Sequence, residues 1–195
     1  MNVGVLAVQG DFEAHRKVLG GLGVETREVR SVAGLEGLDA VVLPGGESTT
    51  QLQFLNDEGL ADALRHFVEH GGAVFGTCAG AILLAREVLN PPQDSLGLLD
   101  ITVLRNGYGR QLDSEVRFGH CALKTAPLEM VFIRAPVIER CGPEVEVLAE
   151  DRGRPVLVRQ GRVLAATFHP ELTDDSTVHT YFLEMVGERV RMAGR

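Results

Sequence analysis

The chain has 195 residues, of which 45% are hydrophobic and 24% are charged, so it is long enough for one compact domain with a continuous core. Its 27 acidic residues outnumber its 19 basic residues and give a formal net charge of -8 at pH 7. This sign disfavours nucleic acid as a partner, because a protein that binds a phosphate backbone must neutralise negative charge. We therefore expect residues 1–195 to form a single domain that binds no nucleic acid.

Two further features bear on where the protein acts. The early apolar run at residues 3–8 has no basic leader and is far shorter than the roughly 20 residues that a membrane-spanning helix requires. The three cysteines, Cys78, Cys121 and Cys141, cannot all pair, and none lies in a C-x-x-C arrangement. We expect a cytoplasmic protein that has at least one free thiol and does not associate with a membrane.

Apolar periodicity in the first half predicts alternating strands and helices. Short runs rich in β-branched residues alternate with amphipathic stretches of helical length, which is the pattern of βαβ units and a mainly parallel sheet. The predicted strands cover residues 3–8, 26–29, 39–43 and 73–75. The predicted helices cover residues 11–22, a stretch from residue 49 with Ser48 as its N-cap, and residues 60–68.

From residue 100 the pattern changes to short strand-like segments that are separated by glycine and proline. These segments cover residues 130–134, 146–149, 155–159 and 163–167, and we expect them to pair largely antiparallel. A last amphipathic helix is predicted at residues 177–192. The predicted fold class is α/β, a three-layer sandwich with a central mainly parallel sheet flanked by helices and with extra antiparallel strands in the second half.

The strongest local motif is Gly-Thr-Cys-Ala-Gly at residues 76–80, which lies between the strand at 73–75 and an apolar helix expected at 81–88. Its glycines permit a tight strand-to-helix turn that lifts the side chain of Cys78 out of the sheet at a strained position. The helix N-terminus favours the thiolate, and the N–H of Ala79 can bind a developing oxyanion. The alternative is that Cys78 is a small buried hydrophobic residue whose neighbours allow close packing.

His169-Pro170-Glu171 supplies a base and a group to orient it. Side chains at i and i+2 of an extended segment point to the same side, and Pro170 biases His169 toward extended geometry. The imidazole and the carboxylate can then form a hydrogen bond that fixes the histidine tautomer. The sequence thus predicts a Cys-His-carboxylate triad of Cys78, His169 and Glu171.

The other histidines are weaker candidates for the base. His169 follows the predicted strand at 163–167, and open α/β sheets place their active sites at such strand ends. Two other histidines, His15 and His120, remain as alternative bases. We expect the five other histidines at the surface or as capping residues: His15, His66, His70, His120 and His179.

Pro-Gly-Gly-Glu-Ser at residues 44–48 also follows a core strand. Paired glycines let backbone N–H groups approach a bound ligand, so we assign the second oxyanion donor to Gly46. The alternative is an ordinary β-to-α turn that Ser48 caps.

Together, the motifs at residues 44–48 and 76–80 and the Phe-His-Pro-Glu-Leu segment at 168–172 resemble the class I, triad-type glutamine amidotransferases. Leu-Ala-Val-Gln-Gly at 6–10, Gly-Gly-Glu-Ser-Thr-Thr at 45–50, Arg-Asn-Gly-Tyr-Gly-Arg-Gln at 105–111 and Phe-Ile-Arg-Ala-Pro at 132–136 look like one family within that class. This family is the glutaminase subunit of pyridoxal 5'-phosphate synthase. The resemblance runs from about residue 3 to the final helix and implies a flavodoxin-like fold.

The resemblance implies a glutamine site beside the triad. An arginine is suited to hold the α-carboxylate of the substrate, although a surface ion pair is the alternative for any one arginine. The implied glutamine-binding residues are Gly46, Glu47, Ser48, Arg105, Ile133 and Arg134. No metal or organic cofactor is implied.

The implied partner is a (β/α)₈-barrel synthase subunit that receives the ammonia in a larger hetero-oligomer and makes pyridoxal 5'-phosphate. Two departures from the family pattern fall in segments that could face this partner. Ala14 precedes His15 where the family commonly has Glu, and Ser114-Glu115-Val116 stands where it has Ser-Phe-Glu.

Three other functions stay open at this point. The chain could be the glutaminase of another synthase, such as the one that makes imidazole glycerol phosphate. It could be a non-catalytic regulatory module with the same fold. It could also be an elbow-cysteine hydrolase of the protease or chaperone type, although these often carry histidine beside the cysteine, where this chain has Ala79.

Overall fold

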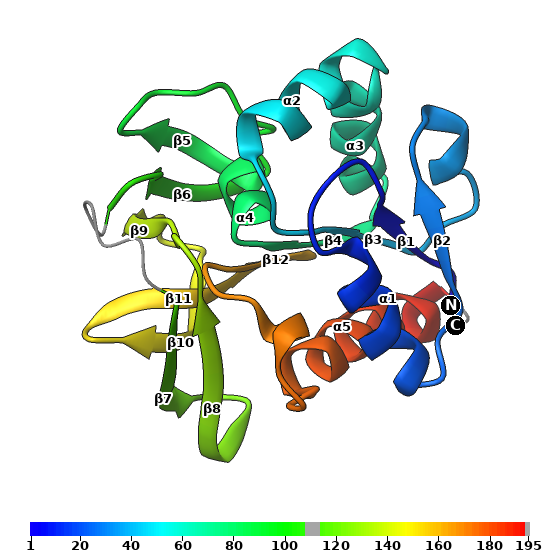
Figure 1. The fold of residues 1–195 in the computed structure, drawn as a ribbon. Helices are drawn as coiled ribbons and strands as arrows, with labels where there is room; N and C mark the ends of the chain where they lie inside the picture. Colours follow the sequence, from blue (N-terminus) through cyan, green and yellow to red (C-terminus); the bar gives the residue numbers. More distant parts are fainter. Residues whose placement is uncertain (108–113, 194–195) are drawn as a thin grey trace.

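A mixed β-sheet forms the centre of the computed structural model, which describes residues 1–107 and 114–193, with side chains described as far as residue 188 (Figure 1). Within these residues the sheet has nine strands in the order β2-β1-β3-β4-β12-β11-β10-β7-β8, and β5, β6 and β9 form a second sheet of three strands. The strands are β1 (Val3–Leu6), β2 (Thr26–Val29), β3 (Ala40–Leu43), β4 (Ala73–Thr77), β5 (Ala85–Leu89), β6 (Leu99–Leu104), β7 (Glu115–Cys121), β8 (Lys124–Phe132), β9 (Val137–Cys141), β10 (Glu146–Asp151), β11 (Arg154–Gln160) and β12 (Val163–Ala166). The helices are α1 (Phe12–Gly21), α2 (Ser48–Asp57), α3 (Leu60–Glu69), α4 (Ala79–Leu84) and α5 (Thr177–Ala193), with 3-10 turns η1 (Val32–Leu35) and η2 (Pro170–Leu172).

The parallel part of the large sheet confirms the βαβ prediction. Strands β2, β1, β3, β4 and β12 lie side by side in parallel register. Because parallel strands end at the same edge of a sheet, the loops after β1, β3, β4 and β12 meet there. These loops carry the motifs on which the functional prediction depends.

The second half of the chain extends this sheet antiparallel, as predicted. Strand β11 pairs antiparallel with β12, and β10, β7 and β8 follow in antiparallel register. Strand β12 therefore joins the two halves, with parallel β4 on one side and antiparallel β11 on the other. The residues after β12 lie between the nucleophile turn and the antiparallel strands.

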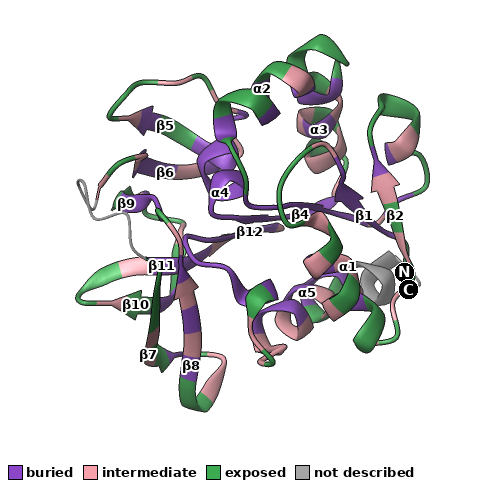
Figure 2. Ribbon diagram, viewed as in Figure 1, coloured by how far each residue is buried: buried purple, intermediate pink, exposed green. Residues whose placement is uncertain are grey.

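Helices cover both faces of the sheet, which gives the predicted three layers. Helices α2, α3 and α4 lie on one face, and α1 and α5 lie on the other (Figure 1). Alternate residues of β3 enter the two cores: Val41 and Leu43 pack with α2–α4, whereas Ala40 and Val42 pack with α1 and α5. Buried residues follow the central strands and α4 in Figure 2, and no helix within the described chain has the length and apolar character to cross a membrane.

Two local predictions were wrong. The apolar stretch predicted as one helix at 81–88 divides, because α4 ends at Leu84 and β5 begins at Ala85, where it pairs with β6. The N-cap of α2 is Glu47 rather than Ser48, and its side chain accepts a hydrogen bond from the N–H of Thr49 at 3.3 Å. Strands β5, β6, β7 and β9 were not predicted.

Candidate active site

Cys78 lies at a strained turn between β4 and α4. Its backbone has φ 48° and ψ -103°, a conformation that residues other than glycine rarely adopt. A hydrogen bond of 2.9 Å from its N–H to the carbonyl of Ala166 ties the turn to β12. A Cβ at Gly80 would lie 2.0 Å from the carbonyl oxygen of Leu43, so this glycine is needed where α4 crosses β3. The predicted elbow geometry is present.

His169 and Glu171 form a buried hydrogen-bonded pair. Nδ1 of His169 lies 2.7 Å from Oε1 of Glu171, and both side chains are almost fully buried. The backbone N–H of His169 donates to the carbonyl of Val131 at 2.8 Å, which fixes it against β8. The predicted extended segment was wrong, because Pro170–Leu172 is a 3-10 turn. The turn itself brings the carboxylate back to the imidazole.

The charges around His169 favour its protonated form. Burial works against this form, but hydrogen bonds and charge at Cys78 and Glu171 outweigh burial and raise the pKa of His169 to about 10. Burial likewise opposes ionisation of Glu171, yet the neighbouring His15 and His169 hold its pKa well below the ordinary value. The arrangement therefore suits a protonated His169 beside an ionised Glu171.

A pocket of about 270 Å³ opens above Cys78. Every predicted glutamine-binding and oxyanion residue lines it together with Cys78 and His169: Gly46, Glu47, Ser48, Ala79, Arg105, Ile133 and Arg134. Glu171 does not line it and lies behind His169. The motif at 105–111 continues into residues 108–111, which lie outside the described residues. Four further lining residues were not assigned from the sequence: Gln9, Asp11, Ile82 and Asn106.

An ion pair forms part of the lining of this pocket. Nη2 of Arg105 lies 3.2 Å from Oε1 of Glu47, and Arg105 is only 16% exposed. Hydrogen bonds from Thr49, with the charges of Arg105 and Arg134, hold the pKa of Glu47 below its ordinary value. Arg134 has φ 44°, a second strained residue at the same pocket. Two cations and a carboxylate match the two charged groups of an α-amino acid.

Gln9 anchors the glycine-rich loop, a role that was not predicted from the sequence. Its Oε1 accepts the N–H of Glu47 at 3.0 Å, and its carbonyl accepts from Nε2 of Gln51 at 3.2 Å. Gly46, between these contacts, has φ 149°. Gln9 comes three residues after the end of β1, so its place near a parallel strand end was the signal that could have identified it.

Two histidines were placed wrongly by the sequence analysis. His15 and His179 are fully buried rather than at the surface or at a cap. Nε2 of His15 lies 3.4 Å from Oε2 of Glu171, on the side of the carboxylate away from His169. Neither alternative base, His15 or His120, is among the residues that line the pocket, and His120 is exposed on β7.

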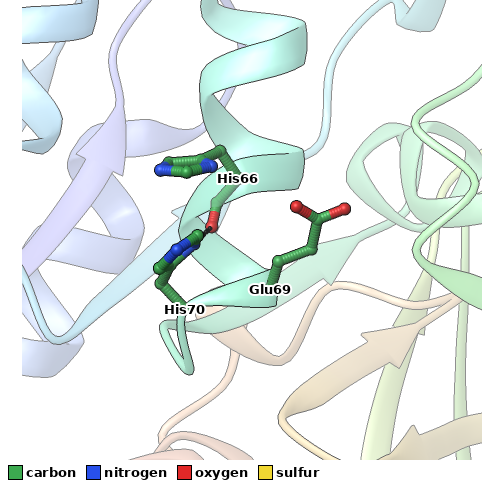
Figure 3. A group of neighbouring side chains, drawn as sticks. All are labelled: His66, Glu69 and His70. Atoms are coloured by element: carbon green, nitrogen blue, oxygen red, sulfur yellow. Dashed lines mark hydrogen bonds between the residues drawn. The ribbon is translucent and has the colours of Figure 1, made fainter.

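Two groups among the described residues bring three potential metal ligands together. Asp11, His169 and Glu171 form the first group; Asp11 and His169 line the pocket, and Nδ1 of His169 is hydrogen-bonded to Glu171 behind it. His66, Glu69 and His70 lie exposed at the end of α3, with Nδ1 of His70 bonded to the carbonyl of His66 at 2.9 Å (Figure 3). Imidazole pairs one helical turn apart suit Zn²⁺ or Ni²⁺. This second group precedes β4, whereas Cys78 follows it, so the group is at the opposite edge of the sheet from the pocket.

Comparison with known proteins places the chain in one family. The SNO glutamine amidotransferase family matches residues 5–188. The chain belongs to the SNO glutamine amidotransferase family. Family members named pyridoxal 5'-phosphate synthase subunit PdxT include one from Koribacter versatilis, 56% identical over 95% of this chain and 96% of that protein. Another, from Deinococcus radiodurans, is 55% identical over 97% and 99% of the two chains.

The fold agrees with this family membership. A crystal structure described as a glutamine amidotransferase superposes with a TM-score of 0.90 at 51% identity, over 95% of this chain and 98% of that chain. The predicted fold class is therefore confirmed. The pocket above Cys78 lies within the part of the chain that the family match covers.

Proposed function

We propose that this chain is a glutaminase that hydrolyses L-glutamine to L-glutamate and ammonia, with Cys78, His169 and Glu171 as its catalytic triad. The observation that carries the proposal is the common pocket, in which a strained Cys78 faces an imidazole held by a buried carboxylate. Membership of a glutamine amidotransferase family supports glutamine as the substrate.

The residues of the pocket have distinct roles in this reaction. The thiolate of Cys78 attacks the side-chain carboxamide, and the N–H groups of Gly46 and Ala79 stabilise the oxyanion. Protonated His169 gives its proton to the departing ammonia, which leaves a glutamyl thioester on the sulfur. Neutral His169 then activates water, which hydrolyses the thioester and restores the thiolate–imidazolium pair. Glu171 keeps the imidazole in the required tautomer.

The charged rim of the pocket selects an α-amino acid. Arg105 and Arg134 hold the α-carboxylate of glutamine, and Glu47 accepts the α-ammonium group. Ser48 and Ile133 complete the site, with Oγ of Ser48 bonded to Oε1 of Gln93 at 2.9 Å. The mutual attraction of Glu47 and Arg105 keeps these groups in place before the substrate arrives.

We further propose that the ammonia passes to a synthase subunit that makes pyridoxal 5'-phosphate. The names of the PdxT relatives support this assignment, because they are subunits of pyridoxal 5'-phosphate synthase. The partner would be a (β/α)₈-barrel in a larger hetero-oligomer, and direct transfer would keep ammonia from protonation in bulk water. Residues 1–195 would act as one domain in the cytoplasm, where three unpaired cysteines are stable.

One assay tests this proposal. Glutamate release should be measured for the full chain with and without the pyridoxal-forming synthase subunit, and pyridoxal 5'-phosphate should be followed by its absorbance. We expect glutamate release and pyridoxal 5'-phosphate formation when both chains and glutamine are present. Glutamate release that responds only to the synthase for imidazole glycerol phosphate, with no binding to the pyridoxal-forming barrel, would overturn the assignment of the partner.

A further inference from the structure

A chain of buried polar side chains continues from the triad into the core between α1 and α5. Oε2 of Glu171, the oxygen that His169 does not use, faces His15 on α1, with Nε2 at 3.4 Å. The same Nε2 lies 3.0 Å from Oγ1 of Thr77, and Nδ1 of His15 lies 3.0 Å from Nε2 of His179 on α5. His15, Thr77 and His179 are fully buried. The proposed mechanism leaves His15 and His179 without a role.

The environment of His15 determines which of its nitrogens carries the proton. Within the described residues, Oε2 of Glu171 has no hydrogen-bond partner of good geometry, although its side chain is fully buried. A lone pair on Nε2 of His15 would face this carboxylate oxygen at 3.4 Å and repel it. An N–H at Nε2 instead points at Thr77 and attracts the carboxylate. We therefore assign the Nε2–H tautomer to His15.

His179 supplies the group that this tautomer requires. If His15 carries its proton on Nε2, its Nδ1 must accept a hydrogen bond, and Nε2 of His179 is the group within 3.0 Å. His179 then carries its own proton on Nε2 and keeps a bare lone pair on Nδ1. Nδ1 of His179 is buried and has no partner among the described residues, which costs less for a lone pair than for an N–H. Burial and the adjacent His15 lower the pKa of His179 to about 3, in keeping with a neutral ring.

We propose that His15 is a positioning residue for the triad: its Nε2–H attracts Oε2 of Glu171, the oxygen that His169 does not use, and His179 keeps His15 in the tautomer that can do so. The proposal rests on the proposed triad for its catalytic consequence. The polar contacts then have one direction: Nε2–H of His179 donates to Nδ1 of His15, and Nε2–H of His15 donates to Thr77 and attracts Oε2 of Glu171. His169 donates to the other oxygen of Glu171. Neither histidine touches the substrate.

Without the donor at His15, the carboxylate of Glu171 is free to rotate away from His169. Its two oxygens are held from opposite sides, by His169 at 2.7 Å and by His15 at 3.4 Å. Loss of one side leaves a buried charged oxygen without an attractive neighbour, and the group would turn toward any donor within reach. The effect should fall on the chemical steps and spare the binding of glutamine.

Two amide substitutions separate the role of this donor from the filling of space. The side-chain nitrogen of glutamine can reach the position of Nε2, whereas that of asparagine ends near the position of Nδ1. In the complex with the synthase subunit, we expect His15→Asn to lower kcat about 10- to 100-fold, comparable with the loss of a group that orients a metal ligand from behind. KM for glutamine should stay within about twofold, and His15→Gln should recover most of kcat. His120→Gln, at an exposed histidine, is the matched control.

A second readout does not depend on glutamine turnover. The rate at which iodoacetamide alkylates Cys78, measured between pH 6 and 10 by mass spectrometry, reports the thiolate that His169 stabilises. We expect slower alkylation at pH 7 in His15→Asn and recovery in His15→Gln, with Cys121 and Cys141 as internal references. If the wild type hydrolysed no glutamine but this pattern appeared, the proposed function would fail and the positioning role would stand.

The positioning role would be overturned if His15→Asn and His15→Gln both kept wild-type kcat and alkylation rates, or if both lost them equally. Should His15→Asn fail to fold, His179→Phe carries the test. It frees His15 to place its proton on Nδ1, and we expect about a tenfold lower kcat with unchanged KM. Wild-type kcat in a folded His179→Phe variant would equally contradict the proposal.

Discussion

The imidazole of His169 packs directly on the α-carbon of Gly45. A Cβ at Gly45 would lie 2.4 Å from Cε1 of the ring, closer than real Cβ atoms approach other heavy atoms, and 3.0 Å from Nδ1. This contact joins the loop after β3 to the segment after β12. The glycine-rich loop and the proposed base therefore fit each other only when residue 45 has no side chain.

Gly45→Ala should displace the imidazole and impair catalysis. Because the neighbour is the ring of the proposed base, a shift of even 1 Å should lower kcat about 100-fold. Glutamate release in the synthase complex measures the effect. Gly20→Ala is the control, because a Cβ there meets nothing within 4 Å, and alanine within α1 should stabilise the fold by about 0.5–1 kcal/mol. Equal activities of the two variants would show that the contact with Gly45 is unimportant.

Glu171→Gln should change both the rate and its pH dependence. The carboxylate raises the pKa of His169, so its loss should move the alkaline limb of kcat/KM from near pH 10 toward neutral by about one unit or more. The limb moves to lower pH because the imidazole must be protonated to donate to the leaving ammonia, and without the carboxylate it loses that proton at lower pH. We expect kcat at pH 7 to fall about 100-fold or more. The control is Glu13→Gln, on the exposed face of α1, which should leave kcat and the alkaline limb unchanged. If Glu171→Gln did not move the alkaline limb, the result would argue against the role of Glu171 in raising the pKa of His169.

The arginines of the pocket should affect binding more than chemistry. Arg105→Met or Arg134→Met removes a charge-assisted hydrogen bond to the α-carboxylate and should raise KM for glutamine about 10- to 100-fold, with kcat within about threefold. Arg86→Met serves as the control, since Arg86 is exposed and faces Asp100 at 3.5 Å. If kcat fell with KM unchanged, the arginines would act on the reaction and not on substrate binding.

His179 should make the fold sensitive to acid. Its pKa is about 3 in the folded chain and near 6.5 when unfolded, so the unfolded state takes up a proton first as pH falls from 6.5. The contribution of neutral His179 to the free energy of unfolding is therefore fully present above pH 6.5. It falls by about 1.4 kcal/mol for each pH unit between pH 6.5 and pH 3. The free energy of unfolding in urea should be measured at pH 7 and at pH 4.5. We expect its decrease between these two pH values to be about 2–3 kcal/mol smaller in His179→Phe than in wild type. Identical losses would place the acid sensitivity elsewhere.

The parts of the site that follow parallel strands could be predicted from the sequence. Cys78 comes directly after β4, His169 comes shortly after β12, and the glycine-rich loop begins after β3. Each strand shows as a short apolar run, and topology brings such strand ends together without any knowledge of side-chain contacts. The predicted path between His169 and Glu171 was wrong, because a proline at the start of a 3-10 turn resembles one in an extended segment.

Contacts between distant segments could not be predicted in the same way. His15 and His179 are 164 positions apart, and each is a single polar residue on a largely apolar helix face. The stretch at 81–88 is apolar throughout its first half, so periodicity cannot show where helix gives way to strand. Pairing with Leu99 of β6 begins β5 at Ala85, and that pairing is tertiary.

The central claim is that the sulfur of Cys78 is the nucleophile for glutamine. Glutamate release by the synthase complex should be measured for wild type, Cys78→Ala and Cys141→Ala, with circular dichroism to show that each chain is folded. We predict that Cys78→Ala lowers release by at least about 1000-fold, whereas Cys141→Ala retains wild-type activity. Wild-type release of glutamate by folded Cys78→Ala would contradict the account.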